Sequence, residues 1–331
     1  MKKIIAMLLC LGLLLCGCAG NDPTGNDQTT GGSGSGLTGG GNAETDPIGG
    51  SSEPDKLTTT AVLKYAHCYD QDMNRRLGLK EDGTPHVFAA EGYSDHEKAL
   101  AWTDLKAVEI SAEVLYGLKK DGSILVLAPE RTLGKLNWDY SAFTDLIQIE
   151  TSDNHAVYGL KADGTVVATG DEAHDVSGWT DIVLLSAGGD SNNMIMGLKS
   201  DGTVVIEGDE AVLGAAQWTD IVHISAGRFH AAGVKSDGTV VTVGRPLDEE
   251  KGDVGEFDVS GWTDIVYVVA ENQTTYGLRS DGTVVCTGRN AKDTFTEWTD
   301  VICIYAGFNG LVALKSDGKL TCTGSWAVFE P

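Results

Sequence analysis

The stretch YGLKADGTVVATG, residues 158–170, returns in close copies down the chain as MGLKSDGTVVIEG, YGLRSDGTVVCTG and VALKSDGKLTCTG. In every copy two apolar runs flank an Asp-Gly pair. Asp-Gly is favoured where a two-residue turn needs positive φ at its centre. Each copy therefore predicts a tight β-hairpin.

These hairpins belong to an array of similar units that covers residues 57–331. Seven Asp-Gly pairs follow one another at intervals of 36 to 44 residues. Between consecutive pairs stands an aromatic-Thr-Asp triplet. A unit of about 40 residues, with three short strands and room for a fourth, cannot bury its faces alone. Neighbours must stack, either as a linear β-solenoid or as a closed propeller, and seven units of blade size favour the propeller.

Residues that recur once per unit are expected to be framework. Packing between blades explains the triplet aromatics better than a ligand platform does. The Asp of each Asp-Gly pair is expected to set the turn, and the Asp of each triplet to hydrogen-bond nearby backbone. The first unit lacks a triplet, so we expect the strand around Trp326 to pair beside the N-terminal strand and close the ring. The structural aromatics are Trp102, Phe143, Trp179, Trp218, Trp262, Trp298 and Trp326.

The sequence of one unit points to a family. Residues 218–244, WTDIVHISAGRFHAAGVKSDGTVVTVG, resemble the repeats of regulator-of-chromosome-condensation (RCC1-type) propellers, especially the short bacterial versions. The resemblance is strong in units three to seven and weaker in the first two. It implies an all-β, seven-bladed propeller and no single activity. WD-repeat propellers are the nearest alternative, but the sequence lacks their Gly-His and terminal Trp-Asp motifs.

The first 56 residues predict an export signal followed by a flexible linker, which we call the tether. Lys2 and Lys3 precede an apolar run, Ile4–Leu15, that has the length of the hydrophobic region of a signal peptide and is too short to span a bilayer. The run leads into a sequence that resembles the bacterial lipobox, which implies a signal peptide over residues 1–17 and a lipid on Cys18. An ordinary secretory signal is the alternative. Residues 18–56 are rich in Gly, Ser, Thr, Asn and Asp and predict a flexible linker.

We therefore expect a bacterial envelope protein whose head is held at the outer surface of a membrane by its lipid alone. The formal net charge is −24, and loss of Lys2 and Lys3 with the leader leaves 22 basic against 48 acidic residues, or −26. Such a surface repels nucleic acid phosphates and anionic headgroups. This excludes nucleic acid as a partner and argues against the nuclear exchange activity of one RCC1-type relative.

No pattern for catalysis, a metal or a cofactor stands out. The histidines lack the spacing of zinc sites, and DQDMN at residues 70–74 lacks the Gly and Glu of a calcium loop. Acid pairs at 171–172 and 209–210 share one repeat position and predict a solvated rim. We expect no enzyme. Four cysteines follow the tether and allow three pairings, although buried thiols are favoured: Cys68, Cys286, Cys303 and Cys322.

The units differ most just after their first strand, and loops on a rigid scaffold are free to bind. Equivalent turns of a propeller emerge on one face, so these segments predict a ring of ligand-binding residues around the central opening. Aromatic, arginine and amide side chains are typical of interaction hot spots, whereas solvated turns without function are the alternative reading. The candidates are Tyr69, Arg75, Asn154, His155, Asn192, Arg228, Phe229, His230, Asn272, Phe308 and Asn309.

His230 also occupies the histidine place of the repeat, where a structural role is favoured. The sequence favours a monomer that recognises a protein ligand through the ring. One alternative is a carbohydrate-binding or glycan-acting surface protein. Another is an inhibitor of an exported enzyme, which is suggested by the resemblance to a secreted bacterial propeller that binds β-lactamases.

Overall fold

A computed structural model describes residues 57–58, 69–71, 75–80, 82–89, 94–111, 114–129, 132, 138–152, 156–188, 194–246, 257–289, 295, 297–307 and 310–323. All of them belong to the unit Ser52–Pro331. The predicted signal peptide, the lipidation site Cys18, the tether, Cys68 and Trp326 lie outside the described residues. Within the described part, no helix has the length and apolar character needed to cross a membrane.

The described strands form seven antiparallel sheets of three strands, each in chain order. The sheets are β1 (Tyr69–Gln71), β2 (Arg75–Leu79) and β3 (Pro85–Ala89); β4 (Leu105–Ser111), β5 (Val114–Lys119) and β6 (Ile124–Leu127); β7 (Leu146–Thr151), β8 (Val157–Lys161) and β9 (Val166–Thr169); β10 (Ile182–Gly188), β11 (Met194–Lys199) and β12 (Val204–Glu207); β13 (Ile221–Ala226), β14 (His230–Lys235) and β15 (Val240–Gly244); β16 (Ile265–Glu271), β17 (Thr274–Arg279) and β18 (Val284–Gly288); and β19 (Val301–Gly307), β20 (Gly310–Lys315) and β21 (Leu320–Cys322).

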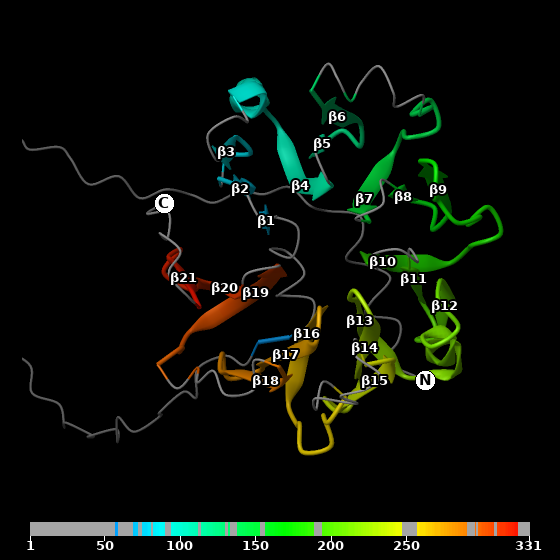
Figure 1. Ribbon diagram of the computed structural model, residues 1–331, viewed down its shortest axis with the longest axis vertical. Coiled ribbons are helices and arrows are strands. Elements are labelled where there is room, and N and C mark those ends of the chain that lie inside the picture. Colours follow the sequence, from blue (N-terminus) through cyan, green and yellow to red (C-terminus); the bar gives the residue numbers. More distant parts are fainter. Residues whose placement is uncertain are drawn as a thin grey trace, which may run out of the picture. The chain divides into compact units, whose positions relative to one another are not determined.

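The seven sheets stand around one axis, with the first strand of each sheet innermost (Figure 1). Each of these inner strands contacts the inner strand of the next sheet, from β1 and β4 through to β16 and β19. Strand β19 also contacts β1, so the ring closes within the described residues. The predicted seven-bladed, all-β propeller is confirmed, and an open solenoid is excluded. The expected seal by the strand around Trp326 falls outside the described part.

Every sheet has three strands in the described residues, so a fourth strand per unit is not part of this fold as described. The stretch between a third strand and the next triplet forms the 3₁₀ helices η1 (Ser94–Ala101) and η2 (Leu213–Gln217) in two units. Residues 170–178 form turns instead. Their sequence, GDEAHDVSG, is polar and lacks the alternation of apolar residues that a strand needs to join a sheet.

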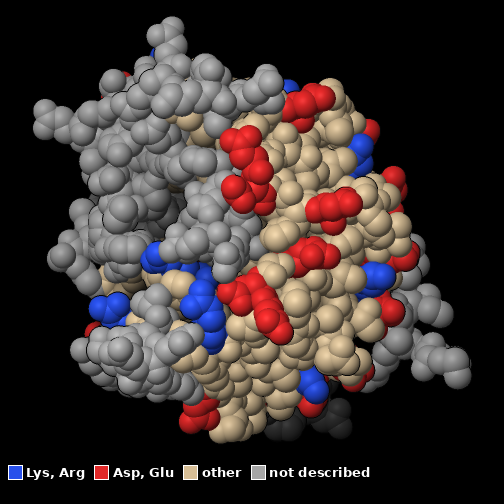
Figure 2. Space-filling model, turned by 45° about the vertical axis from the view of Figure 1, so that its right-hand side comes forward, with Lys and Arg blue, Asp and Glu red and all other residues tan. Residues whose placement is uncertain are grey.

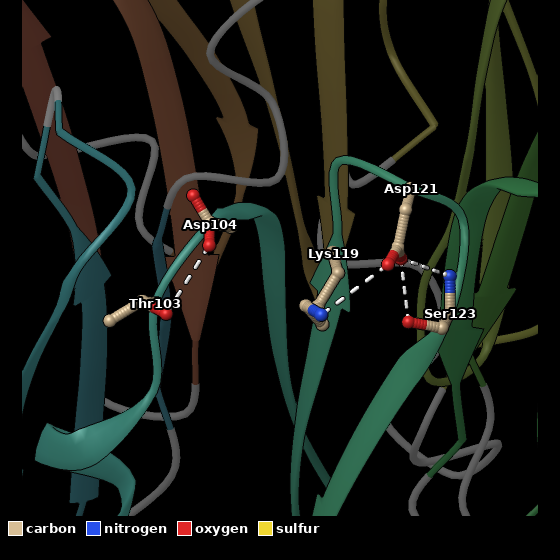
Figure 3. Close-up of polar contacts among 5 residues, drawn as sticks. All are labelled: Thr103, Asp104, Lys119, Asp121 and Ser123. Atoms are coloured by element: carbon tan, nitrogen blue, oxygen red, sulfur yellow. Dashed lines mark hydrogen bonds and ion pairs between the residues drawn. The ribbon is translucent and has the colours of Figure 1, made fainter.

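The Asp-Gly hairpins are confirmed, but their loops have three residues rather than the predicted two. At residues 120–122, the N–H of Gly122 donates to the carbonyl of Lys119 at 3.0 Å, and the N–H of Lys119 donates to the carbonyl of Ser123 at 2.8 Å. Gly122 has a φ of 82°. This is a type I turn followed by one left-handed residue, so only the glycine needs positive φ. The Oδ1 atom of Asp121 accepts hydrogen bonds from the N–H of Ser123 at 2.9 Å and its hydroxyl at 2.6 Å (Figure 3).

The Asp of each triplet is a second left-handed corner. All six have φ between 58° and 62°. The carbonyl of Asp104 accepts a hydrogen bond from the N–H of Lys120 at 2.8 Å, whereas its carboxylate accepts one from the hydroxyl of Thr103 at 3.3 Å (Figure 3). The predicted bond to backbone is therefore made by the main-chain carbonyl. Asp occurs here because its short polar side chain tolerates the left-handed conformation.

Apolar clusters fill the spaces between consecutive sheets, and each cluster contains the triplet aromatic of the later sheet. Phe143 and Trp262 are buried, and the other four described triplet aromatics are half-buried. Several indoles lie on a glycine of the second strand of their own sheet. A Cβ atom at Gly117, Gly197, Gly233 or Gly277 would lie 2.7 to 3.0 Å from the indole of Trp102, Trp179, Trp218 or Trp262, respectively.

Candidate binding face

The two ends of each sheet carry different turns. The Asp-Gly turns join second and third strands, and the variable turns join first and second strands. The N–H of Leu105, at the start of an inner strand, donates to the carbonyl of Gly83 in the preceding Asp-Gly turn at 3.1 Å, and the same bond recurs from Leu146 to Gly122 at 3.0 Å. The bond repeats up to Val301 and Gly282. The Asp-Gly turns therefore share one face, the Asp-Gly face, and the turns after the inner strands share the opposite one, the variable face.

Polar bonds between sheets fix the inner strands close to the variable face. The N–H of Ala226 donates to the hydroxyl of Ser186 at 2.9 Å, and the N–H of Ala270 donates to the hydroxyl of Ser225 at 2.9 Å. The same end of the second and third sheets is joined by the hydroxyl of Ser111, which donates to the carbonyl of Ser152 at 2.7 Å. The scaffold beneath the variable turns is thus bonded from sheet to sheet.

The turn at residues 227–230 of the fifth sheet is described in full and is held on several sides. The N–H of Gly227 donates to the carbonyl of His230 at 2.9 Å, and the N–H of Arg245 donates to the carbonyl of Phe229 at 3.1 Å. A Cβ atom on Gly227 would lie 2.9 Å from the carbonyl carbon of Ala270 in the next sheet. Glycine is therefore required where this turn passes its neighbour.

His230 is the base of this turn and does not face solvent. Its side chain is fully buried, and Nε2 lies 2.9 Å from the hydroxyl of Thr275 in the next sheet. Its ring meets Phe257 edge-on at 5.9 Å between centroids. Burial lowers the pKa of His230 to about 4, because the charged form would be desolvated. The inclusion of His230 among ligand-binding candidates is therefore wrong, because its side chain joins two sheets.

The side chains of Arg228 and Phe229 form a cluster with that of Arg245, which follows β15. The guanidinium carbon of Arg228 lies 5.1 Å from the centroid of the Phe229 ring, and that of Arg245 lies 5.3 Å from it. The Nε atom of Arg245 pairs with Oδ2 of Asp209 at 3.3 Å. Arg228, Phe229 and Arg245 are all half-buried. We call these three residues the Arg-Phe-Arg platform.

Residues 221–247, which contain this turn, match the family model of the regulator of chromosome condensation (RCC1) repeat. Together with the closed ring of similar units, this match identifies the architecture. The protein has the fold of an RCC1-like repeat propeller.

Solved structures of similar fold come from several kinds of organism. The entire ectodomain of the Physcomitrella patens receptor kinase CR4 gives a TM-score of 0.55 at 17% identity, covering 76% of this chain and 70% of that chain. A chain in the structure of Kap60 bound to yeast RCC1 (Prp20) gives 0.50 at 13% identity, with 84% of both chains covered. The C-terminal domain of gp131 from bacteriophage phiKZ gives 0.50 at 13% identity, covering 81% and 94%. No curated protein sequence matches the chain.

In the sixth sheet of the RCC1-like propeller the variable turn is mostly buried. Asn272 is half-buried with a φ of 46°, and its amide donates to the carboxylate of Glu271 at 2.9 Å. Gln273, Thr274 and Thr275 are buried. The start of this turn is therefore the part that a ligand could reach.

The structure does not describe the side chains of the remaining candidates for the ligand-binding ring. Arg75 begins β2 directly after the segment that joins it to β1, whereas Tyr69 begins β1 and pairs with Gly78 farther from that segment, but the side chains of both lie outside the described residues. Asn154, His155, Asn192, Phe308 and Asn309 lie outside them altogether. Among the described candidates, the fold brings Arg228 and Phe229 into contact.

Sequence reasoning missed Arg245 and misjudged Asp209. Arg245 directly follows β15, whose last residue, Gly244, pairs with His230. This pairing carries Arg245 past the end of the ladder to Phe229, so the residue after the third strand is the signal that was available. The sequence predicts that Asp209 belongs to a solvated acidic rim, but its carboxylate is held by Arg245.

Acidic side chains are spread over the described surface in Figure 2, and basic side chains gather beside them at one place.

Within the described residues, no group of three or more His, Cys, Asp or Glu side chains is arranged to hold a metal ion. Cys286, Cys303 and Cys322 are present as thiols, with Cys303 buried and the other two half-buried.

Proposed function

We propose that this protein is a lipid-anchored, extracellular recognition module that binds a protein ligand on the variable face, without catalysis. The observation that carries the proposal is the turn at residues 227–230. It is bonded to its own sheet and to the next one, and it presents Phe229 beside two arginines. Aromatic and arginine side chains on a rigid support are typical of binding hot spots.

The entry point of the chain supports this choice of face. The N–H of Leu57 donates to the carbonyl of Ser280 at 2.7 Å, and Ser280 lies in the Asp-Gly turn between β17 and β18. A tether that precedes Leu57 therefore joins the propeller at the Asp-Gly face. Leu57 therefore lies at the end of the propeller opposite the variable face.

Two of the similar structures are consistent with the proposal. Yeast RCC1 is bound to another protein, Kap60, and the CR4 structure is that of a receptor kinase ectodomain. Each observation concerns that protein, and we extend the general roles of protein binding and extracellular display to this chain as a proposal.

Photo-crosslinking tests the face. A benzophenone amino acid replaces Phe229 in one variant and Lys120, an exposed residue of an Asp-Gly turn, in the other. We expect position 229 to cross-link to a protein from the envelope or its surroundings that then binds the purified head saturably. Position 120 serves as the control. Cross-links from position 120 and none from 229, or a partner that proves to be a glycan, would refute the proposed mode.

Metabolic labelling with an alkyne-bearing fatty acid tests the anchor. The wild-type chain should incorporate the label and fractionate with membranes, whereas Cys18→Ser should do neither because the acceptor thiol is lost. Cys16→Ser is the matched control and should retain the label. Equal labelling of the Cys18→Ser chain would rule out this anchoring site.

A further inference from the structure

We infer that the Arg-Phe-Arg platform binds a carboxylate that stands beside an apolar side chain on the protein partner. This inference rests on the proposed function and specifies the chemistry of one contact. It begins from the position of Phe229, whose backbone is fixed by the bond to Arg245 and whose neighbour His230 is locked to Thr275. A turn whose backbone is already fixed loses less conformational entropy when a ligand binds to it.

The second step concerns the two guanidinium groups. Both lie within 5.3 Å of the ring centroid of Phe229, where the ring face attracts a cation. Asp209 accepts from Nε of Arg245 at 3.3 Å and so orients the planar group. A guanidinium has five N–H donors, and this bond uses one of them. Paired N–H groups of an oriented arginine match a carboxylate in two parallel hydrogen bonds.

The third step separates a carboxylate from a polyanion. The chain has a net charge of −24, and acidic side chains are spread over the described surface beside the basic ones (Figure 2). A nucleic acid or an anionic membrane would bring many phosphates against that surface, whereas a single carboxylate senses mainly charges within a Debye length of about 8 Å. The phenyl ring adds an apolar surface that a bare inorganic anion would not use. A Glu or Asp next to an apolar residue of a protein uses both parts.

A peptide titration followed by NMR tests the inference. The ¹⁵N-labelled protein is titrated with a short blocked peptide in which two glutamates flank a phenylalanine, and with the same peptide carrying glutamines. We expect saturable shifts of the amide signals of residues 227–230 and of the arginine Nε–H signals. The glutamine peptide should bind about tenfold more weakly, because it lacks charge-assisted hydrogen bonds.

Variants locate the effect on the platform. Arg228→Gln and Arg245→Gln should each reduce the affinity for the glutamate peptide about tenfold. Arg279→Gln, on the Asp-Gly face, is the matched control and should leave it unchanged. If a glutamine variant fails to fold, Arg228→Lys and Arg245→Lys keep the charge but lose the planar fork, and they should bind more weakly than wild type.

Equal affinity for the two peptides, an equal loss with Arg279→Gln, or stronger shifts of the same signals by a mixed-sequence oligodeoxynucleotide would overturn the inference. Such a result alone would leave the cross-links from position 229 intact and refute carboxylate recognition. Loss of those cross-links would refute the binding face itself. The two failures are therefore distinguishable.

Discussion

The indole of Trp262 lies on the backbone of Gly277 so closely that a Cβ atom at position 277 would be 2.7 Å from Cζ3 of the indole. Trp262 is buried in the cluster between the fifth and sixth sheets and cannot move outward without opening that cluster. The glycine that recurs in the second strand therefore leaves the space that the triplet aromatic needs to pack against this strand. The same relationship joins Trp102 to Gly117.

Gly277→Ala is expected to lower the free energy of unfolding by about 1–3 kcal/mol, because the added methyl overpacks this interface. Urea unfolding measures the effect as a lower midpoint with an unchanged slope. Gly261→Ala is the matched control, since no atom lies within 4 Å of a Cβ at that position. It should change stability by less than about 0.5 kcal/mol. An equal loss of stability in the two variants would contradict the close packing of Trp262 on Gly277.

Gln148→Met should destabilise the junction between the third and fourth sheets. The amide of Gln148 donates to the carbonyl of Leu185 at 2.8 Å, and the N–H of Leu185 donates back to its Oε1 at 2.9 Å. Methionine leaves both buried main-chain groups without this partner, at a cost of about 1–3 kcal/mol. Thermal unfolding is compared with Gln217→Met, an exposed glutamine of η2. If the two variants melted together, the bridge would contribute nothing measurable.

Stability should fall as the pH drops from about 6.5 to about 4, in part through His230. Its pKa is about 4 in the folded protein, below the ordinary value of 6.5. The unfolded chain therefore binds more protons in this window, which favours unfolding by about 3 kcal/mol at the lower end.

His230→Gln tests this linkage, because glutamine can still bond the hydroxyl of Thr275 but does not titrate. Urea midpoints measured between neutral pH and about pH 4.5 should depend less on pH in this variant than in wild type. Gln217→Met alters an exposed side chain of η2 that does not titrate and should retain the wild-type dependence. A slope unaffected by His230→Gln would show that another group governs the acid sensitivity.

The hydrogen bonds from Ser123 lower the pKa of Asp121 to about 2, with the serine hydroxyl as the largest cause. Because the folded pKa lies below the unfolded one, the stabilising effect of this carboxylate is complete above about pH 4 and is lost toward about pH 2. Ser123→Ala should raise the pKa toward 3.8, measured by carbon NMR of the carboxyl. Ser141→Ala, which alters the turn at Asp139, should leave it in place. An unshifted pKa in Ser123→Ala would exclude the hydroxyl as the cause.

Local sequence determined the hairpins, the number of units and the propeller class. An Asp-Gly pair between apolar runs specifies a turn within a few residues, because backbone preferences and side-chain-to-backbone bonds act over that distance. The hydrogen bond from the N–H of Ser123 to the carboxylate of Asp121 spans two positions and is repeated in unit after unit. Even here the sequence predicted a loop of two residues, whereas the protein uses three. Asp-Gly is compatible with both turns, so the pair alone does not decide the loop length.

Tertiary structure alone decided which candidate residues can meet a ligand. His230 and Phe229 are neighbours in sequence, yet His230 is fully buried whereas Phe229 is half-buried and forms the centre of the platform. His230 is buried because Thr275, 45 residues later, comes within 2.9 Å of it, and Phe229 meets Arg245 because β15 returns beside β14. Burial and contact depend on the neighbouring strand and sheet, which local preference does not encode, so they follow only from how the sheets pack around the ring.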